Sequence, residues 1–126
     1  MKTANAPRLA GFTLVEIMIV VAVIGLLAAI AIPNFVRARA TSQVTACINN
    51  MRQIDSAIQQ ISLEKNLRAG DTINYPADLT PYIKLNSASS IPGCPANGIY
   101  AIQPVGSTPS VTCSLSSLTS QPHVLP

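Results

Sequence analysis

An apolar run near the N-terminus constrains this chain more than any other feature of its sequence. The run reads FTLVEIMIVVAVIGLLAAIAI from Phe12 to Ile32, and its one charged residue is Glu16. As a helix this run rises about 31 Å, which matches the thickness of the hydrocarbon core of a bilayer. With its predicted continuation to near residue 67 the whole helix approaches about 80 Å, and a domain of this size cannot enclose such a rod. The sequence therefore predicts that this segment lies in lipid or among other subunits.

Glu16 has two interpretations within the apolar run. An ionised carboxylate in lipid costs a few kcal/mol at the centre of a helix and less near its end. Glu16 therefore either lies close enough to the interface to reach water or pairs with a cation inside an apolar assembly.

A cleaved secretory signal is an alternative interpretation of the same segment. Lys2 and Arg8 precede the apolar run, and Ala29-Ile30-Ala31 offers a signal peptidase site after Ala31. The run is long for a secretory signal, however, and it carries a carboxylate at its start. The sequence after Pro33 also has a helical pattern, so a retained helix is favoured.

The charge pattern argues against a nucleic-acid partner. The net charge is +3, from eight basic and five acidic residues. Two of the basic residues, Lys2 and Arg8, lie in the first eleven residues, and without them six basic residues face five acidic ones. No basic cluster extends beyond Arg37 and Arg39, so a surface that binds phosphates is not expected.

The helix is predicted to continue beyond Pro33, where a bend or a local loss of helix is expected. Gly25 is a second weak point in the same helix. The continuation, residues 37–69, is amphipathic, and Gly70 supplies a stop signal near residue 67. One face carries apolar residues at spacings of three and four, namely Val44, Cys47, Ile48, Met51, Ile54, Ile58 and Ile61. This apolar stripe must be covered, either by the rest of the chain after residue 69 or by a coiled-coil partner.

Residues 70–126 are predicted to form that cover as a small globular region. Eight of the ten prolines lie after residue 70, which excludes a second long helix. Residues 75–83 predict a turn with a short helical segment, and residues 99–102 and 110–115 predict an antiparallel hairpin. The expected fold class is α+β, with the second half of a long helix packed on a small antiparallel sheet.

The cysteines and the single histidine suggest a disulfide rather than a metal site. Three pairings are open for Cys47, Cys94 and Cys113; the favoured one joins Cys94 to Cys113 across the hairpin, and a bond from Cys47 to Cys94 is an alternative. Zinc is not expected because the chain has no C-x-x-C pair and His123 is interpreted as a tail residue. No Asp or Glu follows Asp78, so no calcium site is expected in the C-terminal loops either. We therefore expect no metal and no cofactor.

Enzymatic activity is not expected. His123 is the one histidine available as a base, and the chain lacks a glycine-rich loop that would hold a phosphate. A small binding domain on a signal or anchor segment fits the composition and is the alternative to a structural role.

The N-terminal residues resemble the signature of type IV pilins and type II secretion pseudopilins. The resemblance rests on Gly11-Phe12-Thr13-Leu14-Val15-Glu16 followed by an apolar run that contains Gly25 and Pro33. The specific motif covers residues 8–36. A looser similarity to the major pseudopilin family continues into the C-terminal half, although the lack of acidic residues after Asp78 departs from members that hold calcium.

This resemblance implies that the chain is processed and then assembled into a filament. A prepilin peptidase would cut between Gly11 and Phe12 on the cytoplasmic side, and the new amino group of Phe12 would be methylated. Residues 1–11 would be a leader, and residues 12–36 the transmembrane and assembly half of the helix. The Glu16 carboxylate would pair with the Phe12 amine of a neighbouring subunit, with a pair inside one chain as the competing arrangement. The segment that contains Gly25 and Pro33 would lose helix in the filament.

The same resemblance implies a location and partners. The precursor would span the inner membrane once with its N-terminus in the cytoplasm, and the mature subunit would join a periplasmic or cell-surface filament of identical copies. An assembly machine with a cytoplasmic ATPase would build that filament. The sequence does not separate a pilus from a secretion pseudopilus. A simple membrane tether would need neither the junction of Gly11 and Phe12 nor Glu16.

Overall fold

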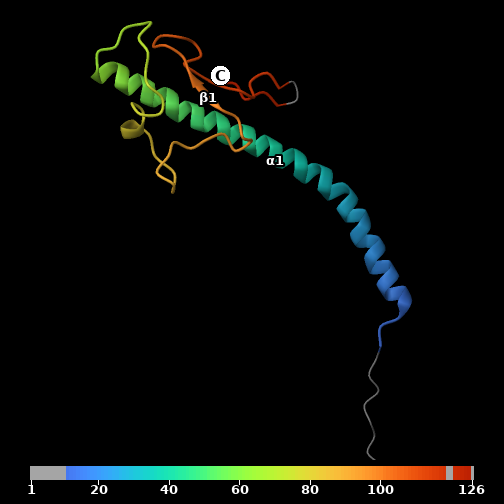
Figure 1. The fold of residues 1–126 in the computed structure, drawn as a ribbon. Helices are drawn as coiled ribbons and strands as arrows, with labels where there is room; N and C mark the ends of the chain where they lie inside the picture. The colour runs from blue at the N-terminus through green and yellow to red at the C-terminus, as the bar shows by residue number, and fades with distance from the viewer. Residues whose placement is uncertain (1–10, 119–120, 126) are drawn as a thin grey trace, which may run out of the picture. The chain divides into compact units, whose positions relative to one another are not determined.

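The computed structural model describes residues 11–118 and 121–125, and it consists of one long helix followed by short elements (Figure 1). In chain order these are helix α1 (Leu14–Glu64), 3₁₀ helix η1 (Thr80–Tyr82), strand β1 (Tyr100–Ile102) and strand β2 (Val111–Cys113). The α+β prediction is confirmed. The expected leader, residues 1–11, lies outside the described residues except for Gly11.

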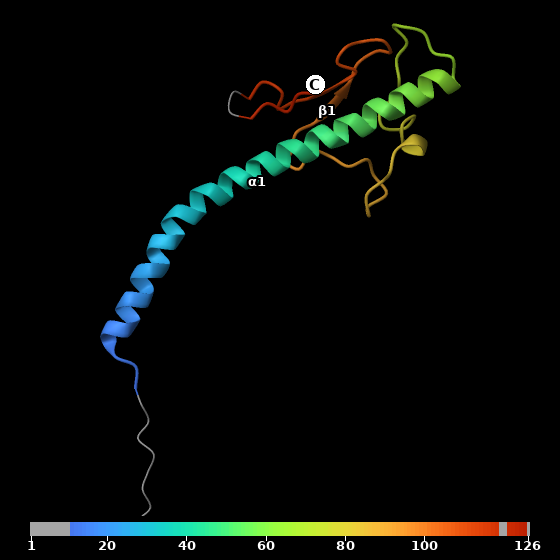
Figure 2. The same ribbon diagram turned by 180° about the vertical axis from the view of Figure 1, so that it is seen from behind.

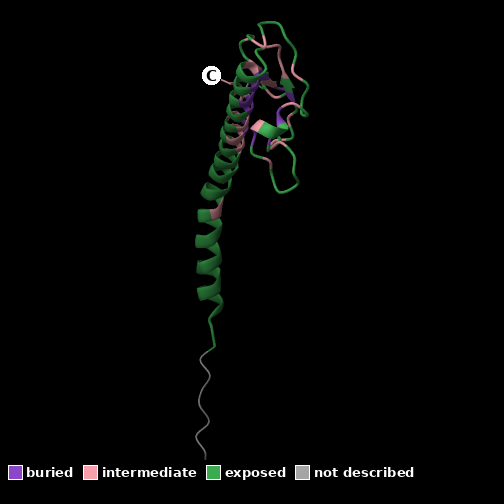
Figure 3. Cartoon of the chain, turned by 90° about the vertical axis from the view of Figure 1, so that its left-hand side faces the viewer, coloured by how far each residue is buried: buried purple, intermediate pink, exposed green. Residues whose placement is uncertain are grey.

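The chain divides into two compact units after Arg37, so α1 contributes to both. In the described part of the first unit, the large apolar side chains of α1 are exposed (Figure 3). This part of α1 is long and apolar enough to cross a membrane.

Helix α1 ends at Glu64, three residues before the predicted end. The residue that ends it is Asn66, which adopts a left-handed conformation with φ 51°. The Leu67 amide donates to the Ser62 carbonyl at 2.9 Å, and the Asn66 amide donates to the Leu63 carbonyl at 3.4 Å. These two bonds form a Schellman motif. The expected stop at Gly70 was wrong because asparagine supplied the left-handed residue earlier in the chain.

The predicted apolar stripe of α1 forms the core of the second unit. Its fully buried members recur at helical spacing, namely Cys47, Met51, Ile54, Ala57, Ile58 and Ile61. Val44 and Ile48 are half-buried at the edge of the stripe. Ala57 was not predicted because its small side chain gives a weak signal. The buried residues of α1 lie only along the half that the C-terminal region covers (Figure 3).

Leu79 and Ile83, on either side of η1, cover one part of the stripe. Leu79 is completely buried and Ile83 nearly so. Prolines at positions 76 and 81 restrict the backbone here, and Pro81 lies in the first turn of η1. The predicted short helical segment is therefore a single 3₁₀ turn.

Strands β1 and β2 cover another part of the stripe as an antiparallel pair. Tyr100 lies opposite Cys113, and Ile102 lies opposite Val111. Tyr100, Val111 and Cys113 are buried, whereas Ala101 is exposed. The hairpin runs beside the second half of α1 in both ribbon views (Figures 1 and 2). Each strand is shorter than predicted, by Ile99 in the first and by residues 110, 114 and 115 in the second. The Ser114 amide still donates to the Ile99 carbonyl at 2.9 Å, just beyond the paired residues.

Substitution of Leu79 by alanine tests whether this contact holds the second unit together. We expect Leu79→Ala to lower the free energy of unfolding by about 2 to 5 kcal/mol, because the side chain is fully buried and leaves a cavity. Leu63→Ala is the matched control, since Leu63 is 80% exposed and should change stability by less than about 0.5 kcal/mol. Denaturant titration of the full chain in detergent, followed by tyrosine fluorescence, measures both, because all three tyrosines lie in the second unit. Equal stability of the two variants would contradict the packing described.

Candidate functional site

Two groups of residues carry the chemistry of this chain, and the first is the start of α1. Helix α1 begins at Leu14, so Thr13 is the N-cap residue and Glu16 the third helical residue. The Glu16 amide donates to Thr13 Oγ1 at 3.2 Å, and the Thr13 amide donates to Glu16 Oε2 at 2.8 Å. This reciprocal pair is a capping box. It gives Glu16 a partner inside its own chain that the sequence interpretation had not considered.

The residues around this cap are open to the surroundings. Phe12 is 85% exposed, and the apolar side chains that follow it on α1 are exposed on all sides. Thr13 Oγ1 also donates to Glu16 Oε2, at 2.9 Å. Within the described residues no hydrogen bond ends on Glu16 Oε1, so one carboxylate oxygen is available to a further donor.

Gly25 and Pro33 both lie inside α1, and the helix is continuous across them. The local loss of helix expected at Pro33 therefore does not occur in the single chain. Proline removes one amide donor from the helix interior, but the missing bond is tolerated here without a break. A side chain at Gly25 would meet nothing within 4 Å, so no contact inside this chain requires glycine at that position.

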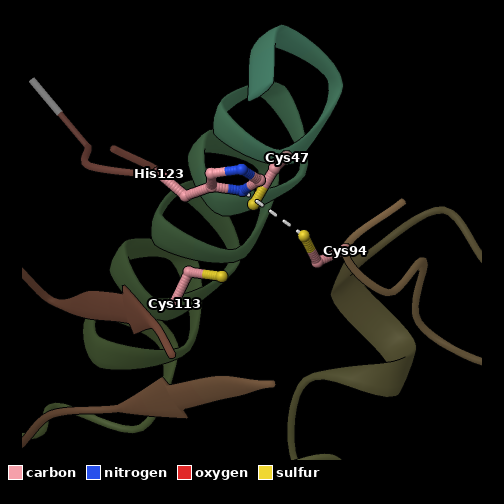
Figure 4. Close-up of side chains that lie close together, drawn as sticks. All are labelled: Cys47, Cys94, Cys113 and His123. Atoms are coloured by element: carbon pink, nitrogen blue, oxygen red, sulfur yellow. Dashed lines mark hydrogen bonds between the residues drawn. The ribbon is translucent and has the colours of Figure 1, made fainter. Parts of the chain in front are cut away.

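The second group brings all three cysteines and the one histidine to a single point in the second unit. Cys47 comes from α1, Cys94 from the loop before β1, Cys113 from the end of β2 and His123 from the C-terminal segment (Figure 4). One ligand atom of each residue lies within 4.8 Å of the others. All four are buried, with exposures of 0%, 7%, 2% and 3% in chain order. We call these four residues the Cys₃His cluster.

Hydrogen-bond donors surround the sulfur atoms of the Cys₃His cluster. The Tyr100 hydroxyl lies 3.4 Å from Cys47 Sγ. His123 Nδ1 lies 3.4 Å from Cys94 Sγ, and Figure 4 shows these two side chains. Burial acts to raise the pKa of the Cys94 thiol, but backbone amides of Ala96 and Gly98 donate to it, and the net effect is a lowered pKa. The Cys47 thiol has no amide donors of this kind, and burial raises its pKa to about 12.

The loop that carries Cys94 is shaped to let the sulfur atoms meet. The Asn97 amide donates to the Cys94 carbonyl at 3.0 Å, and Asn97 has φ 62°, so residues 94–97 form a tight turn. A Cβ atom at Gly98 would lie 2.5 Å from Cys113 Sγ and 3.2 Å from Cys94 Sγ. Glycine is therefore required at position 98 by close approach.

The Cys₃His cluster changes two expectations from the sequence. His123 is not a tail residue, because it is buried and its ring faces Cys94. The structure brings Cys94 and Cys113 together as expected, but it adds Cys47 to the same point and contains all three as free thiols. The disulfide between Cys94 and Cys113 stays a prediction.

Comparisons with known proteins place the N-terminal group in a family. The family model described as "Prokaryotic N-terminal methylation motif" matches residues 8–32. The type IV major pilin protein PilA of Myxococcus xanthus is 48% identical over 60 residues, which are 48% of this chain and 27% of that protein. The type IV major fimbrial protein FimA of Dichelobacter nodosus is 50% identical over 54 residues, which are 43% of this chain and 35% of that protein. The chain belongs to the type IV pilin family.

The family model covers a short N-terminal stretch of the chain, whereas one relative matches most of the chain. The fimbrial protein EcpC of Eikenella corrodens matches more of the chain, with 32% identity over 111 residues that are 85% of this chain and 63% of that protein. The chain spans about a quarter to a third of the length of PilA and FimA. No solved structure gives a significant match.

In this pilin the matched family motif contains the first group of residues and none of the second. Residues 8–32 contain Gly11, Phe12, Glu16 and Gly25 and end just before Pro33. They contain no cysteine and no histidine, so the family motif does not account for the Cys₃His cluster. Sequence reasoning missed this cluster because its four residues are far apart along the chain. The Thr13 cap had a signal, the T-x-x-E spacing that precedes an apolar run.

Gly98→Ala tests the close approach of the two sulfur atoms in this pilin. We expect the added methyl group to lower the free energy of unfolding by about 1 to 3 kcal/mol, because the neighbouring Cys113 must move. Gly93→Ala is the matched control in the same loop, since a side chain there meets nothing within 4 Å. Denaturant titration of the full chain followed by tyrosine fluorescence compares the two. A Gly98→Ala variant as stable as Gly93→Ala would contradict the geometry.

Proposed function

We propose that this chain is a non-enzymatic structural subunit of a type IV pilus-like filament. It is made as a precursor in the inner membrane, cut between Gly11 and Phe12, and assembled through residues 12–36. The observation that carries this proposal is the family match over residues 8–32. Within these residues an exposed apolar helix begins shortly after the junction of Gly11 and Phe12. The relatives named pilin or fimbrial protein favour a pilus over a secretion pseudopilus.

The exposed surface of α1 supports assembly as the purpose of the N-terminal half. Its apolar side chains, among them Leu14, Ile24 and Leu26, are more than half exposed. A soluble monomer rarely exposes a continuous apolar surface beyond a few hundred Å². Lipid covers this surface in the precursor, and the same segments of neighbouring subunits cover it in the filament. Small residues such as Ala28 allow helices to approach closely in such packing.

Glu16 would change partners when the precursor is cut. In the precursor Phe12 has no amino terminus, and Glu16 accepts the Thr13 amide within its own helix. Cleavage creates an ammonium group at Phe12 that enters the apolar assembly and needs a counter-charge. The carboxylate of Glu16 in a neighbouring subunit supplies it, through an oxygen that the cap leaves available. The pair would also set the axial register, because aliphatic side chains alone allow helices to slide.

The proposal defines the partners and the location of the chain. The partners are copies of the same subunit, a prepilin peptidase, and an assembly machine driven by a cytoplasmic ATPase. The precursor spans the inner membrane with its N-terminus in the cytoplasm, and the filament lies in the periplasm or on the cell surface. The near-balance of charge beyond residue 11 argues against nucleic acid as a further partner.

Mass spectrometry of the N-terminus of the chain isolated from cell membranes tests the processing step. The expected mature chain begins at Phe12 and carries a methyl group on its amino nitrogen. A chain that begins at Ile32 would show instead that an ordinary secretory signal was removed. An intact chain that still begins at Met1 would support a simple membrane tether.

Substitutions at Glu16 and Thr13 separate assembly from helix capping. We expect Glu16→Gln to reduce filament yield at least about tenfold, because it keeps a capping side chain but leaves the Phe12 ammonium without a counter-charge. Glu16→Ala and Glu16→Leu should fail in the same way. Thr13→Ala weakens the cap but keeps the charge, so it should retain most of the filaments.

Filaments are measured by electron microscopy of the cell surface, with immunoblots to confirm that each variant is processed and resides in the membrane. Glu64→Gln makes the same substitution on the same helix outside the apolar segment, and it should assemble normally. Normal filaments from Glu16→Gln, or a loss with Thr13→Ala as large as that with Glu16→Ala, would show that capping rather than pairing explains Glu16.

A further inference from the structure

The Cys₃His cluster has the composition and the geometry of a structural zinc site. Structural zinc is held by four protein ligands in a tetrahedron, and three cysteines with one histidine are one of the common sets. With Zn–S bonds of about 2.3 Å, the edges of that tetrahedron are about 3.8 Å long. The ligand atoms here lie within 4.8 Å of one another, so shifts of about 1 Å or less close the site.

His123 already presents a ring nitrogen at the distance that such a tetrahedron requires. Its Nδ1 atom lies 3.4 Å from Cys94 Sγ, and Figure 4 shows the ring directed into the group of sulfur atoms. The side chain is 3% exposed although it lies near the C-terminus. Burial of a histidine in a loop-rich region needs a specific partner, and the three sulfur atoms provide one.

The groups around the sulfur atoms are those that stabilise bound thiolates. Zinc with three thiolates has a net charge of −1, which requires donors when the site is buried. Amides of Ala96 and Gly98 donate to Cys94, and the Tyr100 hydroxyl lies 3.4 Å from Cys47 Sγ. These contacts are the outer-shell interactions expected of a metal site.

We propose that Cys47, Cys94, Cys113 and His123 bind one Zn²⁺ ion. Each cysteine loses its thiol proton on binding, so three protons are released to solvent, and the ring of His123 binds through a nitrogen that carries no proton. All four coordination positions are filled by protein, which makes the site structural rather than catalytic. The proposal replaces the sequence-based expectation that the chain holds no metal.

A zinc ion uses all four residues, whereas a disulfide does not. A disulfide between Cys94 and Cys113 would use only these two residues. The Cys47 thiol and the His123 ring would then be buried beside the bond without taking part in it. Zinc joins α1, the loop before β1, strand β2 and the C-terminal segment at one point. A region with two three-residue strands gains most from such a link, because its own core is small.

Metal analysis of the full chain tests the proposal directly. The chain is purified from membranes in detergent with a tag that contains neither histidine nor cysteine, and bound metal is measured by plasma mass spectrometry. We expect about one zinc per chain. Replacement by Co²⁺ in the unmodified chain should give the intense visible bands and the sulfur-to-metal charge transfer of a tetrahedral thiolate site. This second readout does not depend on any variant that might fail to fold.

Variants then assign the ligands, and the chain is well suited to this because it has three cysteines and one histidine in total. His123→Ala should weaken zinc binding by at least about tenfold, and His123→Cys should restore it, because thiolate is an equally good ligand. Cys94→Ser should lose zinc as His123→Ala does. Ser117→Ala, an exposed neighbour of Cys113, is the control and should keep the metal.

Thiol trapping before purification completes the experiment. Cysteines are alkylated in intact membranes with and without a chelator, and the modified chain is weighed by mass spectrometry. The proposal expects protection of all three thiols until the chelator is added. It is overturned by a disulfide between any two cysteines, by zinc-free protein after reduction and exposure to Zn²⁺, or by zinc affinity that His123→Ala and Cys94→Ser leave unchanged. A chain that binds no zinc but assembles into normal filaments would overturn the zinc proposal and not the proposed function. The two proposals can therefore be tested independently.

Discussion

The structure depends on one helix that meets two different environments along its length. In the first unit, which ends at Arg37, the large apolar side chains of α1 are exposed on every side of the helix. Beyond that point only one face is apolar, and the rest of the chain covers it. Burial of apolar surface is the driving force in both halves of α1. The pattern of apolar residues therefore distinguishes the half that lipid or other subunits must cover from the half that the chain itself covers.

The large features of the fold follow from this pattern and were predictable from sequence. Val44, Cys47 and the residues that repeat their spacing mark the covered face, and prolines exclude a second long helix. The end of the helix was less predictable, because Asn66 and Gly70 both adopt a left-handed conformation. Glycine is the more common residue at such an end, but here the earlier asparagine ends the helix. The strands were predicted too long, since alternation of residues continues past the point at which the partner strand can pair.

The two candidate sites differ in how far sequence could reveal them. The junction of Gly11 and Phe12 with Glu16 is a contiguous motif, so its residue types and spacing are visible in one short stretch. The Cys₃His cluster has no local pattern, because each ligand comes from a different element and only tertiary packing brings them together. Zinc motifs are commonly recognised from pairs of ligands on one turn. Here the turn after Cys94 contains Asn97 and Gly98, which supply a left-handed conformation and a close approach to Cys113 but no second ligand.

The order of elements along the chain also has a consequence for synthesis. The apolar residues outside α1 that pack against its stripe, from Leu67 to Leu125 in the described part of the chain, all lie C-terminal to it. The contact between Tyr100 and Cys47 spans 53 residues, so the stripe is synthesised well before its cover. Contacts at such separation form late in folding. Until its cover is made, a newly synthesised chain exposes two apolar surfaces, the first half of α1 and the stripe of the second half. Chaperones or rapid folding must keep such chains from associating through the stripe.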